Sequence, residues 1–233
     1  MDQINITDLL SPEVGTEATL ANFFYKLYPN KYLYEIETEL FYYVNEHGLY
    51  ICDTGNIDMM TIFNNDFHHI LVLFLNKHKV KQEKKYEKKK EELQADDNLI
   101  VTVKKETSTK LISAVLKKIS NNSFFISVLK QLKTIYKKSK IQWNSDPNIV
   151  GFDNGVYDTN TYIFRNAKNE EYINMTMGYD YKECSAKSRT YVMNFIKSLH
   201  ENDLQASYLL KLLSTTLIGY PLQLFHIFTG KRV

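Results

Sequence analysis

The fold of this chain is decided around one stretch, Ile149-Val150-Gly151-Phe152-Asp153-Asn154-Gly155-Val156-Tyr157-Asp158. Two apolar runs flank Asn154-Gly155, and an Asn-Gly pair accepts the positive φ angles of a tight hairpin turn. A cluster of turn formers, Trp143 to Asn148, precedes it. The stretch therefore predicts a β-hairpin, and we expect short strands at Tyr162–Phe164 and Tyr172–Met175 to follow it.

Two helices are expected after this hairpin. Apolar residues repeat at helical spacing over Val192–Leu199 and again over Leu204–Leu217, and Gly219 is a typical helix terminator. The last apolar run, Leu224–Phe228, has the pattern of a buried strand.

The amino-terminal part predicts a helix followed by a second hairpin. Aromatic and apolar residues repeat at helical spacing from Leu20 to Tyr28, with Thr16 as a cap and Pro29-Asn30 as a stop. Strand-forming residues over Glu39–Val44 and Leu49–Cys52 then flank a four-residue loop that ends in glycine.

The middle of the chain is predicted to be helical and basic. A long helix is expected from Asn65 to Leu93, and two more over Leu111–Ile119 and Phe125–Tyr136. Lys77 to Lys140 contains 18 Lys and 7 Asp or Glu, a net charge of +11, which leaves −9 on the rest of the chain. This asymmetry indicates a surface that faces a polyanion, although a solvated helix explains the same run of charge.

Together these patterns predict an α+β fold that is mainly helical, in three segments. Residues 1–63 form a helix and hairpin module, residues 64–140 a basic helical segment, and residues 141–233 a hairpin and helix module.

Composition excludes several classes of protein. Cys52 and Cys184 are far apart and lack CxxC spacing, which argues against a disulfide scaffold and for a reducing, intracellular compartment. No apolar run approaches the roughly 20 residues that cross a bilayer, so no membrane partner is expected. We expect no metal site, although Asp153 and Asp158 leave open a magnesium-dependent nuclease.

The carboxy-terminal end carries the one hint of nucleotide chemistry. A buried strand followed by Gly230-Lys231 resembles the opening of a phosphate-binding loop, whose backbone amides wrap nucleotide phosphates. The lysine and hydroxyl residue that complete such a loop are absent, so Gly230 is the only candidate nucleotide-binding residue. No catalytic residue is assigned, and the chain alone is expected to lack ATPase activity.

The segment Trp143 to Tyr181 resembles the region before the ATPase of poxvirus-type primase-helicases. The resemblance rests on the Asn154-to-Asp158 motif, on Tyr172 to Tyr181, on the Leu209–Gly219 helix and on the strand leading to Gly230. The same segment resembles the corresponding region of phage and plasmid primases of the carboxy-terminal type.

Membership of this superfamily 3 helicase family implies a role in viral DNA replication. The resemblance implies ATP and Mg²⁺ as cofactors of the complete family protein, with none for this chain. It also implies three partners, namely single-stranded or forked DNA, the remaining helicase polypeptide and a hexameric ring. The expected location is the host cytoplasm or a viral factory.

The best candidates for DNA contact lie in the basic segment, where lysines meet phosphates and a tyrosine stacks on a base. They are Lys77, Lys79, Lys81, Lys84, Lys85, Lys88, Lys89, Lys90 and Tyr86. The alternative is a structural or protein-interaction module, or a degenerate gene remnant, with no DNA role.

Overall fold

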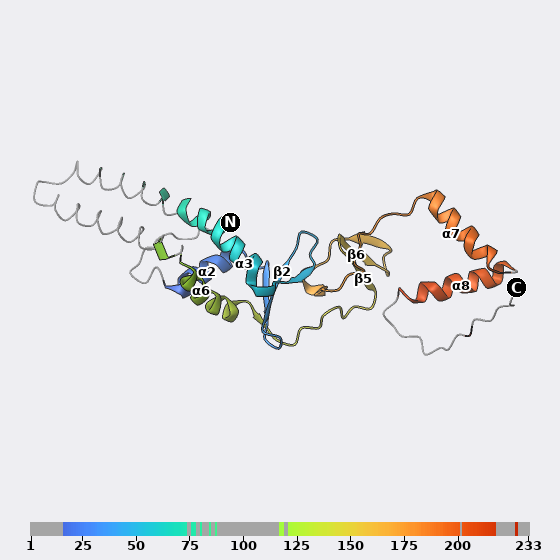
Figure 1. Ribbon diagram of the computed structural model, residues 1–233, viewed down its shortest axis with the longest axis horizontal. Coiled ribbons are helices and arrows are strands. Elements are labelled where there is room, and N and C mark those ends of the chain that lie inside the picture. The colour runs from blue at the N-terminus through green and yellow to red at the C-terminus, as the bar shows by residue number, and fades with distance from the viewer. Residues whose placement is uncertain are drawn as a thin grey trace, which may run out of the picture. The chain divides into compact units, whose positions relative to one another are not determined.

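A computed structural model describes residues 16–73, 76, 77, 80, 84, 87, 117, 118, 121–200, 202–217 and 227. Over these residues the protein is α+β and mainly helical, which confirms the predicted class (Figure 1). The chain divides into two compact units. The first combines Met1–Tyr43 with Cys52–Lys140, and the second combines Val44–Ile51 with Ile141–Val233.

Up to residue 140, the described elements are α2 (Glu17–Leu27), β1 (Tyr32–Glu35), β2 (Leu40–Val44), β3 (Tyr50–Cys52), the 3-10 turn η1 (Thr54–Asn56), α3 (Ile57–Ile62), the π-helical turn η2 (Phe63–Phe67), α6 (Asn122–Ile135) and β4 (Lys137–Lys138). The expected first helix is confirmed as α2. Thr16 caps it, because its Oγ1 accepts from the Thr19 N–H at 3.4 Å.

A four-stranded sheet has the order β3-β2-β1-β4. The predicted hairpin is confirmed as β2 and β3. In its loop the Asn45 side chain accepts from the N–H groups of His47 and Leu49, each at 2.9 Å. Strands β1 and β4 have no counterpart in the sequence-based prediction, because four-residue and two-residue strands carry too little periodicity to indicate them.

The core of the first unit is built from aromatic rings. Phe63 lies 6.0 Å from Phe24 of α2 and 4.9 Å from Phe125 of α6, between ring centroids. All three side chains are buried, so α6 joins the same core as α2 despite their separation in sequence. The predicted helix over Phe125–Tyr136 is confirmed as α6.

The helical run before residue 73 begins earlier than predicted, at Ile57 rather than Asn65. The buried carboxylate of Asp53 accepts from the N–H groups of Asp58 at 2.8 Å and Met59 at 3.1 Å. These bonds satisfy donors that a helix start leaves open, so the helix can begin directly after the turn.

From residue 141 the described elements are β5 (Ile149–Phe152), β6 (Gly155–Asp158), β7 (Ile163–Arg165), the 3-10 turn η3 (Asn169–Glu171), α7 (Ala186–Ser198) and α8 (Asp203–Thr215). The predicted hairpin is confirmed, with Phe152 opposite Gly155 in an antiparallel ladder. Its turn residues are Asp153 and Asn154, one position earlier than the expected Asn154-Gly155, and Gly155 begins β6. Strand β7 extends the hairpin to a three-stranded sheet of order β5-β6-β7.

The strand predicted at Tyr172–Met175 is wrong. The αL conformation of Tyr172, with φ 48, interrupts an extended chain. The Asn144 side chain then accepts from the N–H groups of Asn174 at 3.0 Å and Met175 at 3.2 Å, so a side chain takes the donors that a neighbouring strand would use.

Both predicted carboxy-terminal helices are confirmed as α7 and α8. Ser185 caps α7 and Asn202 caps α8, each through a side-chain oxygen that accepts a backbone N–H. Their buried residues are Ile196 and Ala206. Several large apolar side chains on these helices are instead exposed, including Phe195 at 56% and Leu204 at 83%.

Some predictions fall outside the described residues. These are the strand at 224–228, the stop at Gly219, and most of the helices expected at 65–93 and 111–119. The division into segments 1–63, 64–140 and 141–233 stays a prediction.

Candidate functional site

One face of the three-stranded sheet is aromatic. Because side chains alternate along a strand, Phe152 of β5, Tyr157 of β6 and Phe164 of β7 lie on the same side. Tyr181 packs over them, with its ring 4.5 Å from Phe164 at 16° and 5.5 Å from Tyr157 at 29°. It meets Phe152 edge-on at 5.3 Å. These offset and edge contacts are the favourable geometries for aromatic pairs.

The hairpin turn, Asp153-Asn154, and the Gly155 that follows it position both the sheet and Tyr181. The Asn154 side chain accepts from the Tyr181 N–H at 2.8 Å and donates to the Tyr181 carbonyl at 3.1 Å. Gly155 has φ 147, and a Cβ there would lie 2.7 Å from the Arg165 carbonyl oxygen. The start of β6 therefore needs glycine for its conformation and its close approach, and the turn needs the asparagine amide to hold a distant segment.

Residues 175–181 follow the edge of the sheet as a strap. The Met177 N–H donates to the Gly151 carbonyl at 2.9 Å, and the Asp153 N–H donates to the Tyr179 carbonyl at 3.1 Å. The Thr176 hydroxyl donates to the Asp153 carboxylate. These bonds tie the strap to β5 and to the turn, and they hold its aromatic residues over the sheet.

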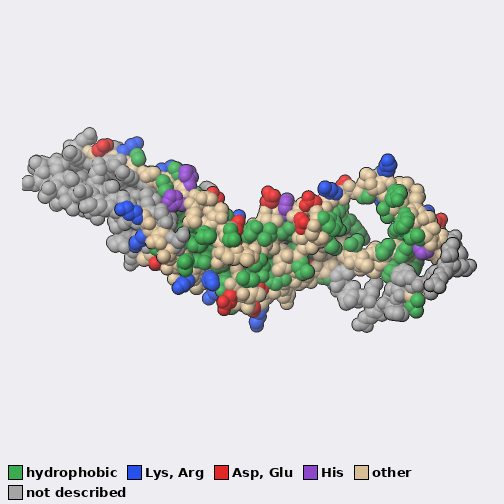
Figure 2. Space-filling model, viewed as in Figure 1, with side chains coloured by type: hydrophobic (Ala, Val, Ile, Leu, Met, Phe, Trp, Pro, Cys, Tyr) green, Lys and Arg blue, Asp and Glu red, His purple; other side chains and the backbone are tan. Residues whose placement is uncertain are grey.

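Tyr179 is the most exposed ring of this group. Its side chain is 59% exposed, and its ring meets Phe152 edge-on at 5.6 Å and 70°. We define the aromatic face as five residues, Phe152, Tyr157, Phe164, Tyr179 and Tyr181. Hydrophobic side chains are visible over β5 and β6 in the space-filling view (Figure 2).

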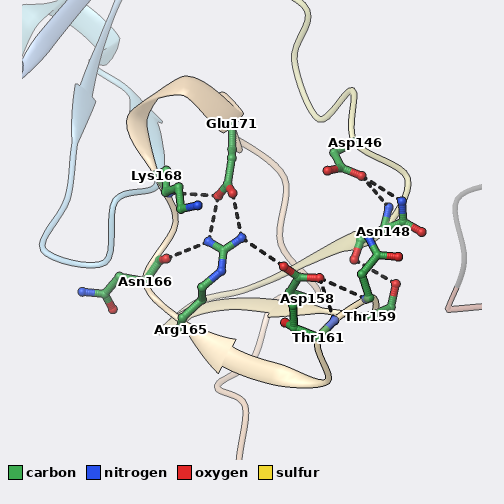
Figure 3. A network of polar contacts seen from close by, with 10 residues as sticks. Asp146, Asn148, Asp158, Thr159, Thr161, Arg165, Asn166, Lys168 and Glu171 are labelled. Atoms are coloured by element: carbon green, nitrogen blue, oxygen red, sulfur yellow. Dashed lines mark hydrogen bonds and ion pairs between the residues drawn. The ribbon is translucent and has the colours of Figure 1, made fainter.

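The opposite side of the sheet carries an ion-pair network (Figure 3). The Arg165 guanidinium binds both carboxylate oxygens of Glu171, at 2.7 and 3.0 Å, and one oxygen of Asp158 at 3.4 Å. Glu171 also accepts from the Lys168 N–H at 2.9 Å. The network fastens η3 to β6 and β7, beside Val156, which is fully buried.

The network lowers the pKa values of both carboxylates. Partial desolvation raises the pKa of Asp158, but hydrogen bonds from the Asn160 and Thr161 N–H groups and from Arg165 leave it below its ordinary value. Desolvation likewise opposes ionisation of Glu171, and its bonds from Arg165 and Lys168 lower its pKa overall. The geometry is that of a structural clamp with satisfied charges.

The two carboxylates of the magnesium hypothesis have separate partners. Asp153 binds Thr176 of the strap, whereas Asp158 binds Arg165 on the side of the sheet that carries Val156. Within the described residues, no three His, Cys, Asp or Glu side chains gather in an arrangement that could hold a metal ion. The nuclease reading therefore has no support from this geometry.

The predicted DNA-contact residues are described only in part. Lys77 and Lys84 lie on helical backbone and are exposed, as lysines that meet phosphates must be. The other candidates fall outside the described residues, and they are Lys79, Lys81, Lys85, Lys88, Lys89, Lys90, Tyr86 and the nucleotide-binding candidate Gly230.

A second group of lysines, close together in the sequence, was not singled out by the sequence reasoning. We define the basic end as the lysines of the last part of α6, of β4 and of the residues after it, which are Lys130, Lys133, Lys137, Lys138 and Lys140. No acidic residue occurs between positions 130 and 140. The absence of acidic residues here could have identified the basic end from the sequence. The denser run of lysines between Lys77 and Lys90 drew the prediction to that segment instead.

Sequence reasoning also missed the aromatic face, because its rings come from strands and a strap that only the fold brings together.

As for membranes, none of the helices in the described ranges is both long and apolar enough to span a bilayer.

Residues 21–201 match the family described as D5 N terminal like. The chain is also similar to a putative helicase, L207/L206, of Acanthamoeba polyphaga mimivirus, at 32% identity over 124 residues. That alignment covers 51% of this chain and 13% of the relative, so the chain spans a small part of the relative's length. With the match covering most of its residues, the chain belongs to the D5 N-terminal-like family, the amino-terminal family of viral primase-helicases.

Proposed function

We propose that this chain is the non-catalytic amino-terminal region of a viral primase-helicase, that it acts in viral DNA replication, and that it contacts DNA phosphates through lysines. The observation that carries the DNA contact is the basic end. Five lysines lie within eleven residues without an intervening carboxylate, and Lys130, Lys137 and Lys140 are exposed.

The local structure favours phosphate contact over random solvation. The Lys133 ammonium lies 5.1 Å from the centroid of the Tyr34 ring, a cation–π contact that restrains its long side chain. Lys137 and Lys138 stand on β4, whose pairing with β1 holds their backbone. Cations on a restrained backbone lose less entropy when they meet a phosphate chain. The competing explanation is protection of a sheet edge, for which lysines are also used.

The test compares two triple variants with the same net charge. Lys130→Gln, Lys137→Gln and Lys140→Gln change the basic end, whereas Lys182→Gln, Lys187→Gln and Lys211→Gln change exposed lysines elsewhere. Binding to a fluorescent DNA duplex is measured from about 50 to 200 mM salt. Log K falls with log salt, and the steepness of this fall reports the number of phosphate contacts. If the basic end binds phosphates, the first variant makes the slope less steep by about 3, and the control barely changes it. Equal slopes for both variants would reject the proposal.

A role in protein docking is the second candidate, and exposed apolar residues in α7, in α8 and directly after α7 favour it. Phe195, Leu199 and Leu204 are each more than half exposed, an unusual share for large apolar side chains on short helices. In this proposal α7 and α8 support the remaining helicase polypeptide. Phe195→Asn with Leu204→Asn should then weaken binding to that polypeptide and leave duplex binding intact, whereas unchanged binding would refute the docking role.

The remaining expectations are part of the same proposal. ATP, Mg²⁺ and a hexameric ring are assigned to the complete family protein, and no described residue of this chain is given a role in hydrolysis. The proposed place of action is the host cytoplasm or a viral factory.

A further inference from the structure

We propose that the aromatic face binds unpaired bases of single-stranded nucleic acid by stacking. This inference rests on the proposed function, because it assumes that the chain works on DNA. It adds a second kind of contact, to bases instead of phosphates, at a place in the chain distinct from the basic end.

The first argument is the availability of ring surface. Tyr179 is 59% exposed, and its ring makes a T-shaped contact with Phe152 at 5.6 Å, so more than half of its surface is open to solvent. Phe152, Tyr157 and Phe164 remain partly buried with Tyr181 packed on them, so Tyr179 is the most open ring of the face. Bases stack on such rings irrespective of sequence, because every base has a π face.

The second argument is preorganisation. Tyr179 and Tyr181 are held by backbone bonds to the sheet and its turn, through the Asp153 N–H and the Asn154 side chain. Tyr181 is stacked on Phe164 within 16° of parallel. A single strand of nucleic acid that binds here contacts rings whose backbone is already held in place. The protein therefore loses little conformational entropy on binding.

The third argument concerns the chemistry of the ligand. Among the described residues, ammonium groups lie over Tyr32, Tyr34 and Tyr43 of the first unit, and over none of the rings of the aromatic face. Arg165, which stands on β7, is engaged by two carboxylates on the other side of the sheet. The face is therefore suited to a flat, apolar surface rather than to a phosphate.

The strap carries two further exposed apolar residues. Met175 is 71% exposed and Met177 is 47% exposed, and both stand on the strap beside Tyr179. Methionine adapts its shape and makes favourable contacts with aromatic rings. In a duplex the bases are already stacked on one another, so only a single strand or a splayed end offers this surface a partner.

The experiment uses the full chain and three fluorescent probes of about 20 nucleotides each, which exceeds the site size of typical single-strand binding folds. The probes are oligothymidine, an abasic strand with the same phosphates and no bases, and a duplex. The variants are Tyr179→Ala and Tyr179→Leu, which remove the π system, and Tyr179→Trp, which restores it. Tyr191→Ala is the matched control, since Tyr191 is 73% exposed on α7.

We expect Tyr179→Ala and Tyr179→Leu to weaken oligothymidine binding by about tenfold, since one stacked base contributes an effect of this order. Affinity for the abasic strand should not change, Tyr179→Trp should bind at least as well as the wild type, and Tyr191→Ala should bind like the wild type. Far-ultraviolet circular dichroism and urea unfolding check that each variant is folded.

The proposal is overturned if the wild type binds the abasic strand as tightly as oligothymidine, or if Tyr179→Leu binds oligothymidine like the wild type. Failure of the proposed function has a different signature. In that case the lysine variants keep the wild-type salt slope, while any base-dependent binding through Tyr179 persists.

Discussion

The side-chain amide of Asn154 closes two hydrogen bonds with the backbone of Tyr181, 27 residues further along the chain. Its oxygen accepts from the Tyr181 N–H and its nitrogen donates to the Tyr181 carbonyl. One turn residue therefore serves two purposes, since it allows the hairpin to form and also fixes the strap that completes the aromatic face.

The clamp predicts a selective effect of Asn154→Asp. Aspartate is a common turn residue like asparagine, but an ionised carboxylate cannot donate to the Tyr181 carbonyl. We expect a loss of about 1–2 kcal/mol in the free energy of unfolding, measured in urea at pH 7. Because a protonated carboxyl regains a donor, part of the loss should be recovered near pH 3. A variant as stable as the wild type would show that the clamp contributes nothing.

Substitution of Gly155 should lower the free energy of unfolding by more than Asn154→Asp does. A Cβ at this position would lie 2.7 Å from the Arg165 carbonyl oxygen and 2.8 Å from Phe164 Cζ. We expect Gly155→Ala to reduce the free energy of unfolding by at least about 2 kcal/mol, from strain and displaced packing. Gly178→Ala is the control, because Gly178 also has a positive φ, of 77, but nothing lies within 4 Å of its Cβ position. Its cost should be near 1 kcal/mol, and equal costs for the two would argue against the close approach.

The ion-pair network predicts a dependence of stability on acid pH. The folded pKa values of Asp158 and Glu171 lie below their ordinary values of 3.8 and 4.5. Their contribution is therefore present above the ordinary values and is lost as the pH falls through the lowered ones. We expect the stability difference between the wild type and Glu171→Gln to shrink as the pH is lowered from 6 to 2, in a series of urea titrations. A difference that stays constant would contradict the assignment.

Ionisation of Tyr50 should make the protein less stable as the pH rises in the alkaline range. Burial, with a smaller contribution from the charge of Glu170, raises its pKa from 10.0 to about 12. Its stabilising contribution is complete below pH 10 and is lost as the pH rises towards 12. Tyr50→Phe removes the ionisable group together with its bond to the Asn169 carbonyl at 3.1 Å. The variant should lose less stability than the wild type between pH 9 and 12, and parallel losses would contradict this prediction.

Local patterns in the sequence predicted most of the regular structure. The hairpin around Asn154-Gly155, the capped helix after Thr16, and helices α6, α7 and α8 all follow from periodicity, caps and turn residues. The same Asn154-to-Asp158 motif carried the family resemblance, which the comparison of residues 21–201 confirms.

The wrongly predicted strand and the strand that was not predicted both depend on contacts between distant residues. The strand expected at Tyr172–Met175 is replaced by irregular backbone, because Asn144, about 30 residues earlier, takes the donors of that segment. The short strand β4 exists because Tyr34 and Lys137 lie opposite each other across about 100 residues. Neither relationship leaves a periodic signal in the sequence.

The sequence by itself determined the class of fold, the elements long enough to show a period, the segregation of charge and the family. These follow from propensity and composition, which act over a few neighbouring residues. Only the tertiary structure decided that Asn154 reaches Tyr181, that Asp153 and Asp158 serve different partners, and that five rings from three strands and a strap form one face. Such sites depend on register and on side-chain direction, which are set when distant segments pack and not by the order of residues alone.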